Sequence, residues 1–267
     1  MILVHEFIKD YLRRLYLEFP YATAYQPGAS PLNNVKRHRK SRFFWLLDLR
    51  HAYQNVDMKK LANILCKLDP RHASHEEEML VFLQKYCMSA IGGLAVGAPA
   101  SPHLFNIYCG TELDQAIAAI CEKKGLVYSR YGDDITISSP VRPVGQRVRQ
   151  QIRQIIVASG FRVNDGKVEL IDLARMKTQS LVINGVGLEL GGRIFIPPQF
   201  VTRLRGLLHK GLRDLSLLHD IQGAMSVFLG LCNRAQPTAT EQKILGMYQR
   251  FRELVRRAKR RRERRWA

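Results

Sequence analysis

The sequence predicts an α+β fold, in which an antiparallel sheet backed by helices precedes a helical region. Two runs rich in Val, Tyr and Ile flank Gly132-Asp133-Asp134 and predict a β-hairpin over residues 126–138. Residues 43–49 form a continuous apolar run, which predicts a strand buried on both faces. We therefore expect a first domain over residues 1–196 and a basic helical domain over residues 197–267.

The amino-acid composition indicates which class of molecule the chain binds. The chain has 267 residues, 46% of them hydrophobic, and a formal net charge of +19. Such an excess of Lys and Arg indicates a polyanionic partner, because each phosphate neutralised releases counterions. An anionic membrane surface is the competing polyanion, but no stretch approaches the roughly 20 uninterrupted apolar residues needed to span a bilayer. The five scattered cysteines lack a CxxC pair, which favours neither disulfides nor a zinc site.

The opening segment is expected to be an amphipathic helix over residues 2–18, with Ile2 and Phe7 on its apolar side. Charged residues throughout this segment leave no uninterrupted apolar centre of the kind that a secretory signal has. We therefore expect a cytoplasmic protein. A loop over residues 19–34 then leads into a basic cluster, which is either a solvated charge run or a contact for a phosphate backbone; we favour the contact. The proposed contact residues are Lys36, Arg37, Arg39, Lys40 and Arg42.

The remaining elements follow from periodicity and turn residues. Ser74 is expected to cap the second of the helices that follow the buried strand. The expected helices are 57–68, 74–88, 102–124, 141–159, 199–215, 217–233 and 240–267, and the further strands lie within 160–170, 179–184, 187–190 and 193–196.

The end of the chain carries its densest positive charge. Arg256, Arg257, Arg260 and Arg261 are candidate nucleic-acid contacts on the last expected helix. The alternative for roughly the last ten residues is a frayed, solvated tail.

Three acidic residues are the candidates for chemistry. Asp48 ends the buried strand 43–49, where an ionised carboxylate is costly unless it meets a cation. Asp133 and Asp134 lie at the expected hairpin turn. Each alone has an ordinary explanation, as a capping residue or a turn residue. Together they suggest carboxylates that meet on neighbouring strands to hold metal ions.

As an ordered set, several segments resemble the prokaryotic reverse transcriptases of the retron and group II intron type. Tyr131-Gly132-Asp133-Asp134 resembles the family's YxDD motif. The other matching segments are NVKRH (34–38), FWLLDLRHAYQNVD (44–57), GLAVGAPASPHLFNI (93–107), GFRVNDGKVEL (160–170) and LVINGVGLELGGRIFIPPQFVTRLRGLLHKG (181–211). The resemblance implies a right-hand polymerase fold with partial fingers and a palm over residues 1–196 and a thumb over 197–267.

The resemblance also implies a reaction. RNA-directed DNA polymerases transfer nucleotides by two-metal phosphoryl transfer, which depends on positioning and charge stabilisation. Hard oxygen ligands suit Mg²⁺, with Mn²⁺ as the alternative ion. Asp48 and Asp133 are expected to bridge both ions, and Asp134 to complete the primer-side ion. Leu49 is the remaining expected metal contact.

Further roles are carried over to matching positions. Tyr53 is expected beneath the sugar, where its ring would exclude a ribose 2′-hydroxyl. Lys167 is expected near the pyrophosphate, neutralising charge or donating a proton. The expected nucleotide-binding residues are Leu49, Tyr53, Gly97, Ala98, Pro99 and Tyr131.

Two departures from the family pattern frame the alternatives. Val96 stands where the loop usually carries Gln, and residues 1–30 have no room for the fingers hairpin that clamps the triphosphate. Either the activity is impaired, or the basic cluster replaces that clamp, or another chain or an upstream start supplies the missing fingers. Competing functions are an RNA-dependent RNA polymerase and a non-catalytic RNA-binding subunit. The expected partners are an RNA template, a primer strand, dNTPs and an effector protein. For a retron or antiviral defence enzyme, the expected template is its own structured RNA.

Overall fold

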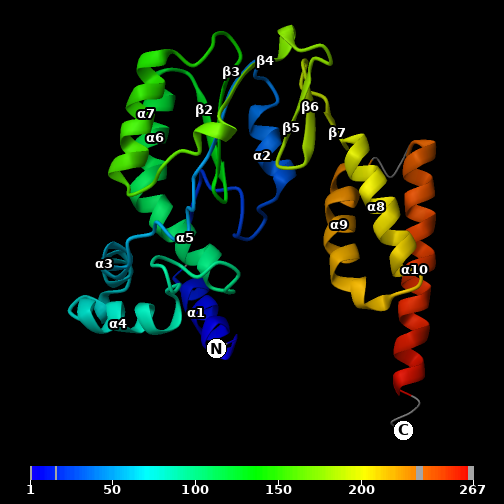
Figure 1. Cartoon of the computed structure of the whole chain (residues 1–267), viewed down its shortest axis with the longest axis horizontal. Coiled ribbons are helices and arrows are strands. Elements are labelled where there is room, and N and C mark those ends of the chain that lie inside the picture. The colour runs from blue at the N-terminus through cyan, green and yellow to red at the C-terminus, as the bar shows by residue number, and fades with distance from the viewer. Residues whose placement is uncertain (1, 16, 233–236, 264–267) are drawn as a thin grey trace. The chain divides into compact units, whose positions relative to one another are not determined.

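The computed structural model describes residues 2–15, 17–232 and 237–263, apart from the side chains of 261–263 (Figure 1). The chain divides into two compact units. One comprises Met1–Gln179 with Leu190–Gly192, and the other comprises Ser180–Glu189 with Arg193–Ala267.

The first unit is built on a four-stranded antiparallel sheet with strand order β2-β3-β1-β4. Its strands are β1 (Phe43–Asp48), β2 (Val127–Tyr131), β3 (Asp134–Ser139) and β4 (Glu169–Asp172). The predicted buried strand and the predicted hairpin are both present, and the α+β fold class is confirmed. β1 is central and apolar on both faces, as its uninterrupted run of apolar residues requires.

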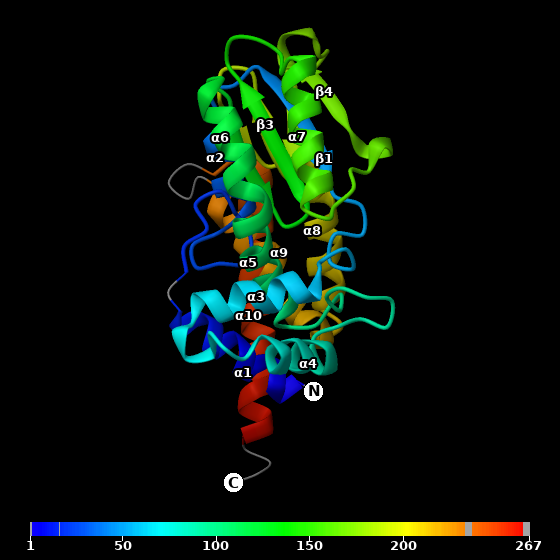
Figure 2. The same ribbon diagram turned by 90° about the vertical axis from the view of Figure 1, so that its left-hand side faces the viewer.

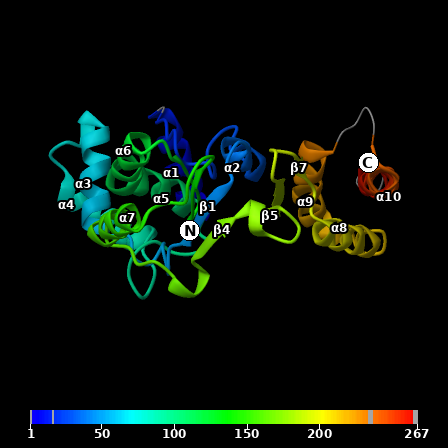
Figure 3. The same cartoon turned by 90° about the horizontal axis from the view of Figure 1, so that it is seen from above.

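Helices cover both faces of this sheet. α6 (Gln115–Lys123) and α7 (Gln146–Ala158) lie on one face, and α2 (Pro31–His38) lies on the other (Figures 2 and 3). α5 (Ser101–Cys109) runs into α6 through a π-helical turn, Gly110–Asp114, so the predicted helix 102–124 is continuous apart from this widened turn. α1 (Ile2–Arg14), α3 (Met58–Leu68) and α4 (Glu76–Tyr86) complete the unit.

The helix predicted for residues 2–18 ends at Arg14, and its predicted apolar side is partly wrong. His5, Ile8 and Leu12 are buried, whereas Ile2 and Phe7 are 72% and 68% exposed. The apolar residues of α1 cover more of the helix surface than the part that packs against the core. Sequence periodicity does not show which part of that apolar surface packs.

The predicted loop 19–34 is wrong in its last part, because α2 begins at Pro31. Ser30 caps this helix by accepting a hydrogen bond from the backbone N–H of Asn33 at 3.1 Å. Pro at the first helical position follows the usual N-terminal pattern. The Ser30-Pro31 pair therefore marks the start of a helix inside the segment predicted as a loop.

Other helix boundaries also differ from the prediction. α4 has His75, not Ser74, at its N-cap position, with no side-chain cap, and Glu76, Glu77 and Glu78 lie in its first turn. α7 begins at Gln146 and not at 141, after a segment that contains two prolines. The strand expected before the turn in 160–170 is reduced to an isolated bridge between Val163 and Leu49.

The second unit contains a three-stranded antiparallel sheet and three helices. The strands are β5 (Ser180–Ile183), β6 (Val186–Glu189) and β7 (Ile194–Phe195), and the helices are α8 (Pro198–Gly211), α9 (Leu218–Leu231) and α10 (Ala239–Glu263). Leu208, Met225 and Phe251, one from each helix, belong to its buried core. The predicted end of the last helix at residue 267 lies outside the described residues. No helix within the described ranges has the length and apolarity needed to cross a membrane.

Candidate functional site

The three predicted carboxylate residues come together at one end of the first sheet. Asp48 ends β1 directly opposite Asp134, which begins β3. Asp133 occupies the hairpin turn, and its backbone carbonyl accepts a hydrogen bond from the N–H of Leu49 at 3.1 Å. The antiparallel register therefore places Asp48, Leu49 and the Asp133-Asp134 pair side by side, although they are far apart in the sequence.

Asp48 is held by two side chains from the segment that follows α7. Its Oδ2 accepts from the Nζ of Lys167 at 2.9 Å, and its Oδ1 accepts from the Nδ2 of Asn164 at 2.9 Å. The backbone N–H of Asn164 also donates to the carbonyl of Asp48 at 2.8 Å. The hydrogen bond to Asp48 raises the pKa of Lys167. The structure thus places Lys167 beside Asp48, at the same end of the sheet.

Asp133 is in an environment that disfavours its charge. Burial raises the pKa of its carboxyl, and the neighbouring Asp48 raises it further, against Lys167 and Arg130, which lower it. A divalent cation would relieve this desolvation and repulsion. No group of at least three His, Cys, Asp or Glu side chains in the described part of the chain is already arranged to hold a metal ion. The donor types fit Mg²⁺, while the carboxylate of Asp48 is turned to Lys167 and Asn164.

A buried arginine supports the hairpin turn. Arg130 is fully buried, and its Nε and Nη2 donate to the two carboxylate oxygens of Asp114 at 2.9 and 2.8 Å. Its Nη1 donates to Asn106 Oδ1 at 3.0 Å and to the carbonyl of Gly132 at 2.9 Å. The hydroxyl of Tyr128 also donates to Asp114 at 2.7 Å. The residue just before Asp133 is therefore anchored to the helix that carries Asp114.

Sequence reasoning missed this arginine. The available signal was a charged residue inside a predicted strand, two positions after Tyr128 and therefore on the same face as that ring. Its acid partner lies 16 residues earlier, on the π-helical turn. π-helical turns occur often at functional sites, but nothing in the sequence marks this one.

Tyr53 is fixed by aromatic contacts next to the carboxylates. Its ring stacks on Phe105, with centroids 4.6 Å apart and planes inclined by 22°. Burial raises the pKa of Tyr53, and a hydrogen bond with Tyr25 and the charge of Asp133 act in the same direction. Arg130 lies 5.4 Å from the Phe105 ring centre, so the hairpin network and Tyr53 share one aromatic support. Tyr25 was also missed, because it stands in a segment predicted as a loop.

The loop of small residues over 92–102 is hydrogen-bonded to the turn that contains Tyr53. The N–H of Leu94 donates to the carbonyl of Tyr53 at 2.7 Å, and a Cβ at Gly93 would collide with the backbone of Tyr53 and Gln54. Gly97 has a φ of 84°, which favours glycine, and Val96 is 67% exposed. The predicted nucleotide-binding residues Ala98 and Pro99 follow in the same loop, and Tyr131 ends β2 beside Asp134.

The predicted phosphate-contact residues fall into two groups. Lys36, Arg37, Arg39 and Lys40 are exposed on and after α2. Arg42 instead forms a two-pronged ion pair with Asp172, at 2.7 and 2.8 Å.

His38, within the same basic cluster, is a buried structural residue. Its ring nitrogens lie 2.6 Å and 2.7 Å from the hydroxyls of Ser138 and Ser129. Burial lowers its pKa to about 3, so the imidazole is neutral. The histidine of the NVKRH segment therefore joins α2 to the sheet.

On the last helix, Arg256, Arg257 and Arg260 are exposed. The side chain of Arg261 lies outside the described part of the chain. These arginines belong to the second compact unit.

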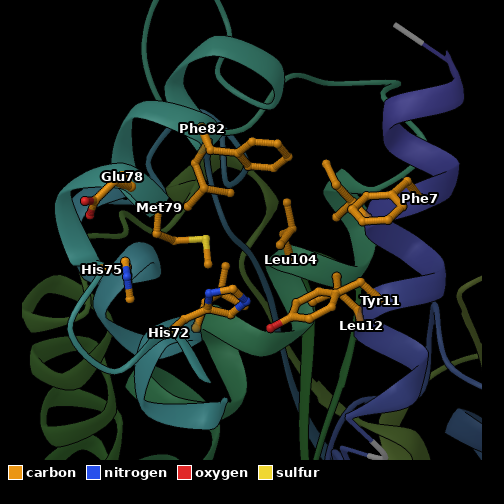
Figure 4. A pocket seen from close by; sticks show the side chains of 12 residues that line it. Phe7, Tyr11, Leu12, His72, His75, Glu78, Met79, Phe82 and Leu104 are labelled. Atoms are coloured by element: carbon orange, nitrogen blue, oxygen red, sulfur yellow. The ribbon is translucent and has the colours of Figure 1, made fainter. Parts of the chain in front are cut away.

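An apolar pocket is separate from the carboxylate cluster. It has a volume of about 400 Å³ and is lined mainly by α1 and α4, with Phe7 and Tyr11 on one side and Met79 and Phe82 on the other (Figure 4). None of its lining residues is a predicted site residue. The carboxylates and not this pocket therefore define the candidate site.

The chain belongs to the family described as reverse transcriptase (RNA-dependent DNA polymerase), whose model matches residues 3–246. The predicted family is thereby confirmed. The retron Mx162 reverse transcriptase of Myxococcus xanthus is 25% identical over 82% of this chain and 50% of its own length. The retron Ec86 reverse transcriptase of Escherichia coli is 27% identical over 64% of this chain and 52% of its own. The chain spans about half the length of the curated relatives it matches.

Two solved structures have a fold similar to that of this chain. The telomerase of Candida tropicalis in complex with a TWJ fragment of telomeric RNA superposes with a TM-score of 0.53 and 10% identity, over 84% of this chain and 44% of that one. The apo telomerase of Candida tropicalis gives a TM-score of 0.50 and 11% identity, over 74% and 40%. At such identity the likeness shows the fold alone.

The Arg130–Asp114 pair should be costly to break from one side. We expect Arg130→Met to lower the free energy of unfolding by about 3–5 kcal/mol, because it leaves Asp114 buried without its cation. Arg130→Met combined with Asp114→Leu should cost less than Arg130→Met alone. Urea unfolding followed by circular dichroism measures both.

The matched control for this prediction is Arg153→Met, which breaks the exposed pair with Asp165 and should change the free energy by no more than about 1 kcal/mol. Equal losses for Arg130→Met and Arg153→Met would contradict the assigned role of the buried pair.

Proposed function

We propose that this chain is an RNA-directed DNA polymerase that adds deoxynucleotides to a primer on an RNA template. The observation that carries the proposal is the register of β1 and β3, which sets Asp48 against Asp134 next to the turn residue Asp133. Membership of the reverse transcriptase family supports it. Carboxylates on neighbouring strands are the arrangement that nucleotidyl transfer needs for divalent ions.

Asp48, Asp133 and Asp134 would hold the metal ions, with Leu49 alongside. Mg²⁺ is the proposed ion and Mn²⁺ the substitute, because both favour oxygen ligands. When bound, such ions lower the pKa of the attacking hydroxyl and neutralise charge on the transferred phosphate. The raised pKa of Asp133 supports this assignment, because a carboxyl that is costly to ionise alone gains most from a nearby cation.

The surrounding side chains would orient the nucleotide. Tyr53, stacked on Phe105, would present its ring to the sugar and exclude a 2′-hydroxyl. Lys167 is 64% exposed while its ammonium contacts Asp48, so it can reach the leaving pyrophosphate from the same edge. There it would neutralise charge or donate a proton. Gly97, Ala98 and Pro99 would form the backbone surface under the base.

The template and primer would be bound by basic residues outside the carboxylate cluster. Lys36, Arg37, Arg39 and Lys40 are exposed and available to phosphates, whereas Arg42 would first have to leave Asp172. On α10 the exposed residues Arg256, Arg257 and Arg260 would make further contacts. The template is proposed to include a structured RNA of the chain's own, as the similarity to retron enzymes suggests.

The test is incorporation of labelled dNTPs on a primed RNA template with Mg²⁺. We expect Asp133→Asn to reduce the rate by at least about 100-fold, since it removes a charge that binds the metal ions. Asp165→Asn is the matched control, because Asp165 is an exposed carboxylate outside the cluster and should leave the rate within about twofold. Activity retained in Asp133→Asn would contradict the assigned metal-binding role of Asp133, whereas no incorporation by the unsubstituted chain with its cognate RNA would favour a non-catalytic RNA-binding role.

A second test separates DNA synthesis from RNA synthesis. Tyr53→Ala should raise rNTP relative to dNTP incorporation by about 10-fold or more, because it removes the ring beneath the sugar. Tyr53→Phe keeps the ring and should preserve the preference for dNTPs. If the unsubstituted chain prefers rNTPs, or if both variants behave alike, the assigned role of Tyr53 is wrong.

A further inference from the structure

A basic cavity lies in the first unit between the end of α6 and the start of α7. It has a volume of about 560 Å³, and its lining includes Lys124, Arg142, Arg147 and Gln151. The three cations come from the last turn region of α6, the loop after β3 and the first turn of α7. Segments distant in the sequence thus bring three positive charges to one hollow.

The three cations have no acidic partner in the lining of the cavity. The cavity lining contains no Asp or Glu. Within the described residues, Lys124, Arg142 and Arg147 form no ion pair, in contrast to Arg42, which pairs with Asp172. Side chains of like charge that converge without a counterion repel one another, so an anion entering the cavity would be stabilised.

The start of α7 adds to the positive potential. Gly145 is its N-cap and supplies no side-chain hydrogen bond, and the first turn has no acidic residue. The first backbone N–H groups of this 13-residue helix are therefore left for an external acceptor. The helix dipole favours negative charge at this end, in the same direction as the three cations.

The cavity is at the opposite end of the sheet from the carboxylates. Leu126 lines it, and the next residue, Val127, pairs with Ser138, whereas Tyr131 at the other end of β2 pairs with Asp134. Four residues of extended strand correspond to about 13 Å. A phosphate in the cavity is therefore distinct from one that reacts at Asp48 and Asp133.

We propose that this cavity is a second RNA-binding site, which holds backbone phosphates of RNA outside the copied segment. The class of ligand follows from the cations and uncapped helix start, which recognise phosphodiester charge and not base identity. Its volume of about 560 Å³ exceeds what one phosphate requires, and Lys123, the sequence neighbour of Lys124, is also exposed. The site would anchor a structured RNA while another segment occupies the carboxylate end.

The test is direct binding of a fluorescein-labelled 24-base-pair RNA duplex, measured by anisotropy without nucleotides or Mg²⁺ at several NaCl concentrations. The triple variant Lys124→Gln, Arg142→Gln and Arg147→Gln should bind at least 10-fold more weakly near 150 mM salt. Its slope of log affinity against log salt should be shallower by about two units, as fewer counterions are released. The single variant Gln151→Glu should weaken binding in the same direction.

The matched control is Lys59→Gln, Lys67→Gln and Lys85→Gln, which removes the same charge from exposed positions on α3 and α4. It should change affinity by less than threefold. Equal losses in the two triple variants would overturn the proposal by showing only a net-charge effect. Displacement of the RNA by 2 mM inorganic phosphate at matched ionic strength would also overturn it, because the cavity would then be a site for the free ion. The assay involves no polymerisation, so its outcome is independent of the proposed catalytic activity.

Discussion

The buried ion pair between Arg130 and Asp114 is the constraint on which the candidate site depends. Burying two charges is costly, and the cost is offset only when every donor and acceptor finds a partner. Here the guanidinium reaches both oxygens of Asp114, the side chain of Asn106 and the carbonyl of Gly132. The contact with Gly132 fixes the turn immediately before the two adjacent aspartates.

The same pair links the hairpin to the other parts of the site. Asp114 belongs to the π-helical turn between α5 and α6. The ring of Phe105 on α5 stacks with Tyr53 and also contacts the guanidinium of Arg130. On the other side of the cluster, Lys167 and Asn164 hold Asp48. Asp48, Tyr53 and Lys167 are thus positioned by a few side-chain contacts and not by the loops alone.

Local patterns made the sheet and its carboxylates predictable from the sequence. A long apolar run ending in Asp48 and a Gly-Asp-Asp turn between β-rich segments each have a direct backbone meaning. The long-range partners were not predictable in this way. Arg130 contacts Asp114 only after the sheet and helices have packed, and the same holds for His38 with Ser129 and Ser138. Which apolar residues of α1 are buried also depends on how that helix packs against the core. Lys167 was placed near the site by resemblance, but its contact with Asp48 required the fold.

The central claim is that Asp48, Asp133 and Asp134 together form a divalent-cation site. Iron-dependent backbone cleavage tests it most directly: Fe²⁺ replaces Mg²⁺, and added ascorbate and peroxide produce hydroxyl radicals that cut the chain near the bound ion. If these carboxylates bind the ion, we expect cuts close to Asp48 and to the Asp133-Asp134 turn, both suppressed by excess Mg²⁺ and lost in Asp133→Asn. Cleavage confined to other segments, or cuts at these positions that Mg²⁺ and the substitution leave unchanged, would contradict it.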